Sequence, residues 1–382
     1  MHCRKIVFAG LALAIAINHV FYASAAERPS VKSPQVSDDG RVTFELYAPN
    51  VQKVSMNCGE MQSQIGASSK EMTKGENGVW SLTVGPLKPG IYDYTFDVDG
   101  VVNTDPSSPF VFGNRQGSRG YVEVPGPKGQ PRHDEWRDVP HGSVNIHWYA
   151  SSAAEGARRR VHVYTPPDYF KNGEKKYPAL YLLHGSGDND SHWMWIGRAN
   201  VVADNLIADG KSQPMIVVMP DGHVPLPVSM EQDRANRWSR SREAFEKDLM
   251  TDVIPLVESA YRVLPGRENR AIVGLSMGGG QSLFVGLNNL DTFAWVGGFS
   301  SAARGMEPVV AKLAAEAEGV NKQMKLLWIA IGKNDFLLEE NHNFIKSLKD
   351  NKIDHIYNET EGAHQWSVWR LYLSEFIPLL FR

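Results

Sequence analysis

The residues with the clearest chemical potential form the pattern Gly274-Leu-Ser-Met-Gly278. An apolar, β-branched run precedes this pattern, and residues 281–287 follow it with the apolar spacing of a helix. A strand, a tight turn and a helix are the context that a G-x-S-x-G nucleophile elbow requires. We therefore predict Ser276 as a nucleophile and the N–H of Met277 as one oxyanion-hole donor, although so short a pattern also occurs by chance.

A serine nucleophile of this kind needs a histidine base, which follows both the serine and the acid in the chain. Three histidines come after Ser276. His342 falls within an expected helix and His355 at the start of an expected strand, where packing would fix the ring. His364 lies in the loop after the last expected strand, so we predict His364 as the general base.

The acid of the triad should lie between the serine and the histidine, at the end of a strand. Asp335 meets this condition, because it follows the apolar strand that ends at Gly332. We predict that Asp335 orients His364, against the alternative that it caps the next helix. Asn334 and Glu339 are the fallback candidates. The other aspartates in this interval are expected at the opposite edge of the sheet: Asp291, Asp350 and Asp354.

The second oxyanion donor is expected in the loop after an earlier strand, and the N–H of Ser186 is our choice. We expect His184 to act as a hydrogen-bond partner rather than as a base. His184 is also grouped with Trp193, Trp195 and Trp366 as a candidate substrate-binding residue. The three tryptophans could line a pocket for an aromatic acyl group, but core packing accounts for each equally well.

These residues need a scaffold that brings the ends of several strands together. Apolar strands alternate with amphipathic helices over residues 141–382, which predicts an α/β domain with a buried, mostly parallel central sheet. Residues 27–125 instead contain short strands with period-two alternation and turn residues between them, and we identified no helical stretch there. We predict a small antiparallel β-sandwich, joined to the second domain by a stiff, exposed linker over residues 126–140.

Residues 1–26 have the basic start, apolar core and small terminal residues of a secretory signal peptide, with cleavage expected after Ala25 or Ala26. Cys3 would leave with it, and Cys58 alone allows no internal disulfide. We expect a secreted or periplasmic bacterial protein with no membrane span in the mature chain. The formal net charge is −3 and no basic tract occurs, which argues against a nucleic-acid partner. The histidines lack metal-ligand spacing, so we expect no metal and no cofactor.

The first domain resembles the immunoglobulin-like modules that precede glycogen-debranching and related enzymes. The resemblance rests on the segments 44–54, 78–80, 89–100 and 105–106. It implies either a polysaccharide-binding module or a brace for the catalytic domain. Trp80, Tyr92 and Tyr94 could stack on sugars, but aromatic residues in short strands usually belong to the core, so we predict no glycan site there.

The second domain resembles the putative-esterase family, which includes feruloyl esterases, acetylxylan esterases, S-formylglutathione hydrolases and mycolyltransferases. The resemblance implies an α/β-hydrolase fold, with Ser276, Asp335 and His364 as the triad and Met277 and Ser186 as the oxyanion donors. Asp221 departs from the asparagine that many relatives carry, and residues 224–242 form an insert expected to shape the substrate pocket. The matching segments are Tyr164–Tyr169, Leu183–Asp188, Ala203–Lys211, Val218–His223, Asp252–Glu258, Arg267–Gly279 and Gly362–Arg370.

Together these features predict a serine carboxylesterase that removes acyl groups, foremost feruloyl, from a plant cell-wall polysaccharide such as arabinoxylan. Removal of acetyl groups from xylan and acyl transfer are alternatives within the same chemistry. A polysaccharide-binding protein with a vestigial esterase domain is the alternative outside it. The acylated polysaccharide or oligosaccharide is the partner that all of these alternatives share.

Overall fold

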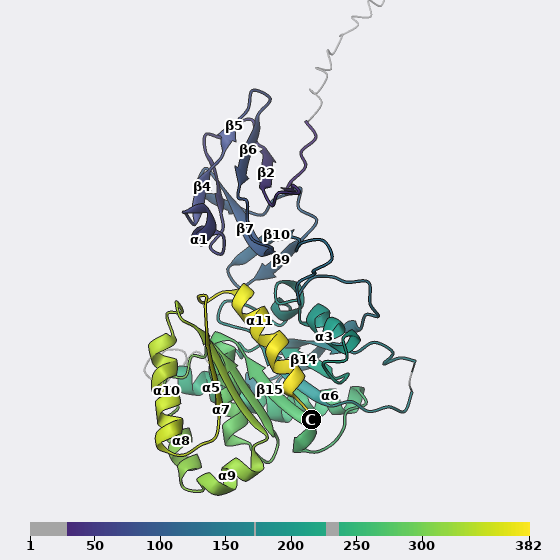
Figure 1. The fold of residues 1–382 in the computed structure, drawn as a ribbon, viewed down its shortest axis with the longest axis vertical. Coiled ribbons are helices and arrows are strands. Elements are labelled where there is room, and N and C mark those ends of the chain that lie inside the picture. Colours follow the sequence, from purple (N-terminus) through teal and green to yellow (C-terminus); the bar gives the residue numbers. More distant parts are fainter. Residues whose placement is uncertain (1–28, 172, 227–236) are drawn as a thin grey trace, which may run out of the picture.

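The computed structural model describes residues 29–171, 173–226 and 237–382. These ranges contain a β-sandwich followed by an α/β domain, and the sandwich sits on one end of the α/β domain (Figure 1). The signal peptide expected over residues 1–26 lies outside the described residues. Residues 227–236 of the expected insert also lie outside them.

The first domain consists of antiparallel strands in two sheets. One sheet has the order β1-β2-β6-β5, and the other has the order β4-β3-β7-β10-β9 with β8 paired to β7. A short helix, α1 (Gln62–Ile65), lies in this domain, where we expected none. The strands are β1 (Gln35–Val36), β2 (Val42–Tyr47), β3 (Val54–Asn57), β4 (Ser69–Glu71), β5 (Thr73–Lys74), β6 (Val79–Val84), β7 (Gly90–Val98), β8 (Val101–Asn103), β9 (Val111–Asn114) and β10 (Gly117–Val124).

The core of the sandwich follows from the alternation of its strands, since every second residue of a strand faces the same side. Along β2, Val42, Phe44 and Leu46 are buried while the residues between them are partly exposed. Trp80, Tyr92 and Tyr94 are buried in this core as well. These three rings are therefore not presented on the surface as a sugar-stacking platform.

An eight-stranded sheet forms the centre of the second domain, in the order β11-β12-β14-β13-β15-β16-β17-β18. The six strands from β14 to β18 in this order are parallel to one another. At the other end of the sheet, β12 pairs antiparallel with β14, and β11 pairs antiparallel with β12. The predicted fold class is confirmed. The strands are β11 (Ser143–Ala150), β12 (Arg158–Thr165), β13 (Ala179–Leu183), β14 (Ile216–Pro220), β15 (Arg270–Gly274), β16 (Trp295–Phe299), β17 (Leu326–Gly332) and β18 (Ile356–Thr360).

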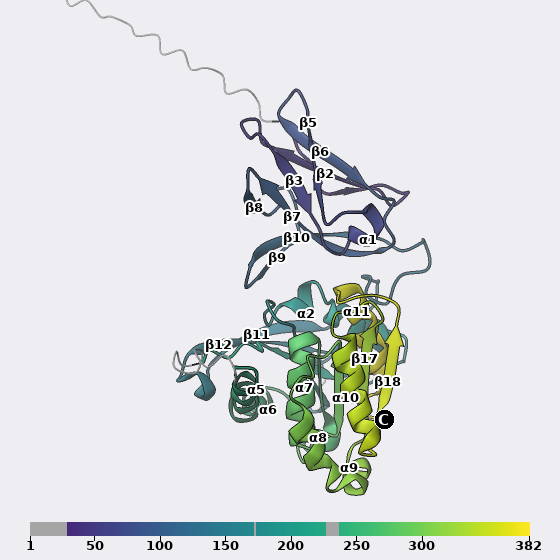
Figure 2. The ribbon, with the colours of Figure 1, turned by 90° about the vertical axis from the view of Figure 1, so that its left-hand side faces the viewer.

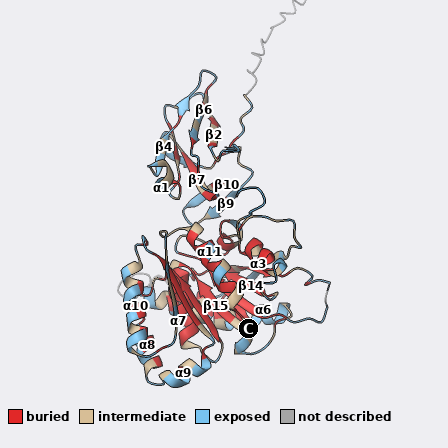
Figure 3. Ribbon diagram, viewed as in Figure 1, coloured by how far each residue is buried: buried red, intermediate tan, exposed pale blue. Residues whose placement is uncertain are grey.

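Helices cover both faces of this sheet. Side chains of α5 to α10 pack on one face, and those of α2, α3 and α11 pack on the other. Figure 2 shows α7, α8 and α10 side by side, and Figure 3 shows that the strands between the helix layers are buried. The helices are α2 (His192–Trp195), α3 (Ala199–Ala208), α5 (Arg237–Asp248), α6 (Ile254–Ala260), α7 (Ser276–Asn288), α8 (Glu307–Ala314), α9 (Ala317–Gln323), α10 (Leu338–Asp350) and α11 (Trp366–Phe376).

Arg370 of α11 connects the two domains and the segment between them. Its side chain is 1% exposed, and its guanidinium donates to the Ile196 carbonyl at 2.8 Å and to the Ile91 carbonyl of the sandwich at 3.4 Å. The Arg370 Nε also forms an ion pair with Asp134 at 2.7 Å. Asp134 is 3% exposed, so the segment expected as an exposed linker is exposed only in part.

Candidate active site

The expected elbow is formed between β15 and α7. Ser276 has φ = +53°, a left-handed conformation that residues with a side chain rarely adopt. A Cβ on Gly274 would lie 2.4 Å from the Gly278 carbonyl oxygen, and a Cβ on Gly278 would lie 2.4 Å from the His184 carbonyl oxygen. Both positions therefore require glycine, because β15, the turn and the loop after β13 approach one another closely. The turn presents the Ser276 hydroxyl at the end of β15.

The structure brings Ser276, His364 and Asp335 together from three loops at the carboxyl ends of β15, β18 and β17. His364 Nε2 lies 3.0 Å from Ser276 Oγ. On the other side of the ring, His364 Nδ1 lies 2.9 Å from Asp335 Oδ2 and 3.0 Å from Oδ1. This arrangement can pass a proton from the hydroxyl to the imidazole while the carboxylate stabilises the imidazolium.

Asp335 is held in its ionised form at this position. Burial by itself would raise the pKa of its carboxyl group, but hydrogen bonds from His364 and from the Leu337 N–H outweigh burial, so the pKa lies below its usual value. The bond from the Leu337 N–H lies in the turn before α10, but Leu337 itself occupies the N-cap position of that helix and no side-chain capping hydrogen bond forms there, so the alternative prediction of Asp335 as the N-cap is wrong.

Two aromatic rings fix the imidazole of His364. The Phe336 ring lies 4.4 Å from the His364 ring, and the Trp369 ring meets it edge to face at 4.8 Å. Trp369 Nε1 donates to Ser300 Oγ at 3.0 Å, which holds the indole. Sequence reasoning did not select Phe336 or Trp369, although both are close in sequence to predicted triad residues.

The loop after β13 packs against the elbow. A Cβ on Gly185 would lie 2.6 Å from Leu275 Cδ1 and 3.4 Å from Ser276 Cβ, so this glycine permits the contact. Ser186 is the next residue and lines the cavity above Ser276. Met277 lies in the first turn of α7, where backbone N–H groups have no carbonyl partner within the helix. Ser186 and Met277 thus lie on two segments that flank the serine.

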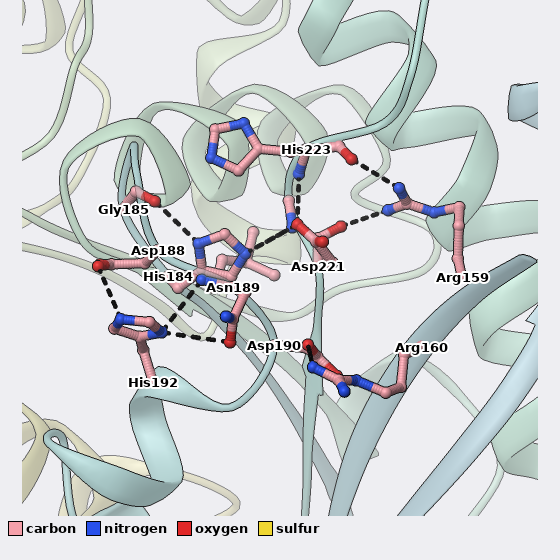
Figure 4. A network of polar contacts seen from close by, with 12 residues as sticks. Arg159, Arg160, His184, Gly185, Asp188, Asn189, Asp190, His192, Asp221 and His223 are labelled. Carbon is pink, nitrogen blue, oxygen red and sulfur yellow. Dashed lines mark hydrogen bonds and ion pairs between the residues drawn. The ribbon is translucent and has the colours of Figure 1, made fainter. Parts of the chain in front are cut away.

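His184 lies beneath this loop and is 1% exposed. Its Nδ1 is 2.8 Å from the Gly185 carbonyl oxygen, and its Nε2 is 2.9 Å from the Gly222 nitrogen and 3.2 Å from Asp221 Oδ1 (Figure 4). Burial by itself would lower the pKa of His184, but Asp221 outweighs burial and raises it. His184 therefore joins the loops after β13 and β14, as the hydrogen-bonding prediction stated, and is not a residue of the cavity wall.

A cavity of about 600 Å³ opens above the serine. Among the sequence-predicted residues, Ser276, Ser186, His364, Trp366 and the fallback candidate Asn334 line it, whereas Trp193 and Trp195 do not. Trp193 is 1% exposed and its Nε1 donates to the Leu183 carbonyl at 2.9 Å, so core packing is what the structure shows for this ring. The side chain of Trp195 is half-exposed outside the cavity.

Within residues 29–171, 173–226 and 237–382, the structure has no group of three or more His, Cys, Asp or Glu side chains arranged to hold a metal ion. No helix in the same ranges combines the length and apolar character needed to cross a bilayer.

The sheet order, the elbow and the hydrogen-bonded Ser276, His364 and Asp335 define the class of α/β-hydrolases. Comparison with family models narrows this class. The model of the putative esterases matches residues 152–380, so the chain belongs to that family. A model of carbohydrate-binding module 48, the isoamylase N-terminal domain, matches residues 21–109.

Two relatives similar in sequence to this chain are also named as esterases. The endo-1,4-beta-xylanase/feruloyl esterase of Xylanibacter ruminicola is 29% identical over 377 residues, which cover 95% of this chain and 48% of that protein. The chain thus spans about half the length of this relative. The acetyl esterase of Caldicellulosiruptor saccharolyticus is 25% identical over 232 residues, covering 51% of this chain and 80% of that protein.

Solved structures share the fold. A ferulic acid esterase from the anaerobic fungus Anaeromyces mucronatus superposes with a TM-score of 0.55 at 26% identity, covering 65% of this chain and 93% of its own. An enterobactin esterase from Shigella flexneri superposes with a TM-score of 0.62 at 17% identity, covering 88% of this chain and 92% of its own. At 17% identity, the second similarity concerns the fold alone.

Proposed function

We propose that this chain is a serine carboxylesterase that removes feruloyl groups from a plant cell-wall polysaccharide such as arabinoxylan. One observation carries the esterase part of the proposal. Ser276 Oγ, His364 and Asp335 form a continuous hydrogen-bonded series, with distances of 3.0 Å and 2.9 Å, and the serine opens into a cavity of about 600 Å³.

The proposed reaction proceeds through an acyl-enzyme. His364 Nε2 takes the proton of Ser276, and the serine oxygen attacks the ester carbonyl carbon. The N–H groups of Met277 and Ser186 hold the oxyanion of the tetrahedral intermediate. His364 then gives its proton to the departing sugar alcohol. A water molecule, deprotonated by His364, attacks the acyl-enzyme, and the carboxylic acid leaves while Ser276 regains its proton. Asp335 stays ionised and stabilises the imidazolium in both halves.

The lining and the volume of the cavity favour a substrate with an aromatic acyl group over one with an acetyl group. Phe336, Trp366 and Trp369 line it beside the serine, and aromatic rings provide large, flat apolar contacts for a phenyl ring. Its volume of about 600 Å³ leaves an acetyl group largely without contacts. The Xylanibacter ruminicola relative carries feruloyl esterase in its name, which supports the same choice.

Acetyl removal from xylan is the second candidate, and the similarity to an acetyl esterase favours it. The two candidates are separated by measuring release of ferulate from methyl ferulate and of acetate from acetylated xylan with the same preparation. Release of ferulate with little acetate supports the feruloyl proposal. Acetate release alone would replace it, and no turnover of either substrate would point to an unrelated ester or to the polysaccharide-binding alternative.

Export of the protein is also part of the proposal, on the basis of the signal-peptide pattern in residues 1–26. Expression in a bacterial host with fractionation and N-terminal sequencing of the product tests it. We expect a product that begins at Ala26 or Glu27 in the periplasm or medium. An unprocessed chain confined to the cytoplasm would contradict export.

A further inference from the structure

The wall of the cavity above Ser276 is built by both domains. The α/β domain supplies the triad side and the aromatic side. The β-sandwich supplies Glu60, Asp93 and Arg119, which line the same cavity although they lie far from the elbow in sequence. The sandwich therefore lines the same cavity as the serine.

The sandwich is held in this position by backbone contacts as well as by Arg370. The Arg115 N–H donates to the Gly187 carbonyl at 2.9 Å, and Asn189 Nδ2 donates to the Gly113 carbonyl at 2.7 Å. These contacts join the turn between β9 and β10 to the loop that carries Ser186. Arg119 lies on β10, a few residues beyond this contact, so its position relative to the serine is fixed by both domains.

Arg119 and Asp93 form an ion pair on the neighbouring strands β10 and β7. The Arg119 side chain is 29% exposed and that of Asp93 is 18% exposed, so both remain accessible from the cavity. Asp93 contacts Nε of the guanidinium. Within the described residues, the two terminal Nη groups of Arg119 make no hydrogen bond and can donate to a substrate.

This pair has the chemistry that a sugar requires. A hydroxyl group both donates and accepts hydrogen bonds, and a guanidinium beside a carboxylate offers donors and an acceptor at adjacent points. In an ester of a sugar, the part rich in hydroxyl groups is the alcohol that leaves, whereas the aromatic acyl group carries few.

We propose that the β-sandwich forms part of the active site, with Arg119 and Asp93 binding hydroxyl groups of the sugar that carries the scissile ester. The proposal rests on the esterase function proposed above. It makes the two residues specificity determinants for the alcohol, so their effect should depend on whether the substrate contains a sugar.

The test compares kcat and KM on three esters: feruloylated arabinoxylo-oligosaccharide, methyl ferulate and methyl cinnamate. Only the first contains sugar, and only the first two contain the phenol. For Arg119→Ala, we expect kcat/KM on the oligosaccharide to fall about tenfold further than on methyl ferulate, mainly through KM. If Arg119→Ala does not fold, Asp93→Asn serves as the second variant, because it keeps the side-chain volume. We expect it to shift the selectivity in the same direction.

Arg41→Ala is the matched control. Arg41 also pairs with an aspartate of the sandwich, Asp39, but that pair is exposed and outside the cavity. We expect Arg41→Ala to match the wild type on all three esters, with thermal unfolding measured for every variant to establish folding.

Two results would overturn the proposal. Equal losses on all three esters would assign Arg119 and Asp93 a structural role, and a loss on methyl ferulate but not on methyl cinnamate would assign them to the acyl phenol. If wild-type protein turns over none of the esters, the proposed esterase function itself fails, which is distinct from either result.

Discussion

A carboxylate oxygen of Glu60 lies 2.8 Å from the backbone nitrogen of Trp366 and accepts its hydrogen bond, although the two residues belong to different domains. Trp366 is the first residue of α11, where a carboxylate is favoured by the helix dipole. It also follows His364 by two residues. The sandwich is thus hydrogen-bonded to the segment that carries the proposed base.

This bond leads to a prediction about pH and stability. Burial raises the pKa of Glu60 to about 7, although the Arg370 guanidinium opposes the shift. The folded protein therefore binds more protons than the unfolded chain between the ordinary glutamate pKa of about 4.5 and pH 7, and the free energy of unfolding falls as the pH rises through this window. We expect Glu60→Gln to make this decline shallower, as measured by chemical unfolding from pH 5 to pH 8.

The decline should not vanish in Glu60→Gln, because burial also raises the pKa of Asp188 to about 7. Glu71→Gln is a control, since Glu71 is exposed on the sandwich. An unchanged pH dependence in Glu60→Gln would mean that the carboxyl of Glu60 does not titrate differently in the two states.

The role of Asp335 is tested by Asp335→Asn. The amide cannot stabilise the imidazolium and can select the wrong tautomer of His364, so we expect kcat on methyl ferulate to fall by about 10³-fold or more. Asp291→Asn changes an exposed aspartate away from the cavity and should retain wild-type turnover. Comparable activity in Asp335→Asn and the wild type would exclude Asp335 as the acid.

Replacing a glycine of the elbow should cause a steric clash with the neighbouring backbone. Gly278→Ala places a Cβ against backbone of the loop after β13, which cannot move without shifting Gly185 and Ser186. We expect a loss of about 1–3 kcal/mol in the free energy of unfolding, together with a loss of activity. Gly319→Ala in α9 meets no atom within 4 Å and should be neutral or slightly stabilising. Equal stability of the two variants would contradict the close packing of the elbow.

Phe336 tests the preference for an aromatic acyl group. Its side chain is 75% exposed and covers the His364 ring beside the cavity. We expect Phe336→Leu to lower kcat/KM for methyl ferulate about threefold to tenfold more than for methyl acetate, because a planar ring contact is lost. Identical changes on the two esters would show that Phe336 acts through His364 alone.

The order of strands and helices and the grouping of Ser276, Asp335 and His364 could be predicted from sequence for a physical reason. In a parallel sheet the carboxyl ends of all strands meet at one edge, so a polar residue just after a strand is already placed near the others. The elbow is encoded locally, by two glycines that no other residue can replace without collision.

The contribution of the sandwich could not be predicted in this way. Glu60, Asp93 and Arg119 line the cavity because the two domains pack against each other, and such packing leaves no periodic signal in the sequence of either domain. The burial of Trp193 could not be predicted either, because the sequence near an active-site loop does not indicate whether a tryptophan ring faces the cavity or the core. Its bond to the Leu183 carbonyl is a tertiary contact.

The most direct test of the central claim is covalent labelling of the nucleophile. Mature protein is treated with a fluorophosphonate, and the modified peptide is identified by mass spectrometry while ferulate release is followed in parallel. The account predicts one phosphonyl group on Ser276, formed in step with the loss of activity, and neither labelling nor turnover in Ser276→Ala. Turnover that persists in Ser276→Ala, or a label on Ser186 in active protein, would contradict it.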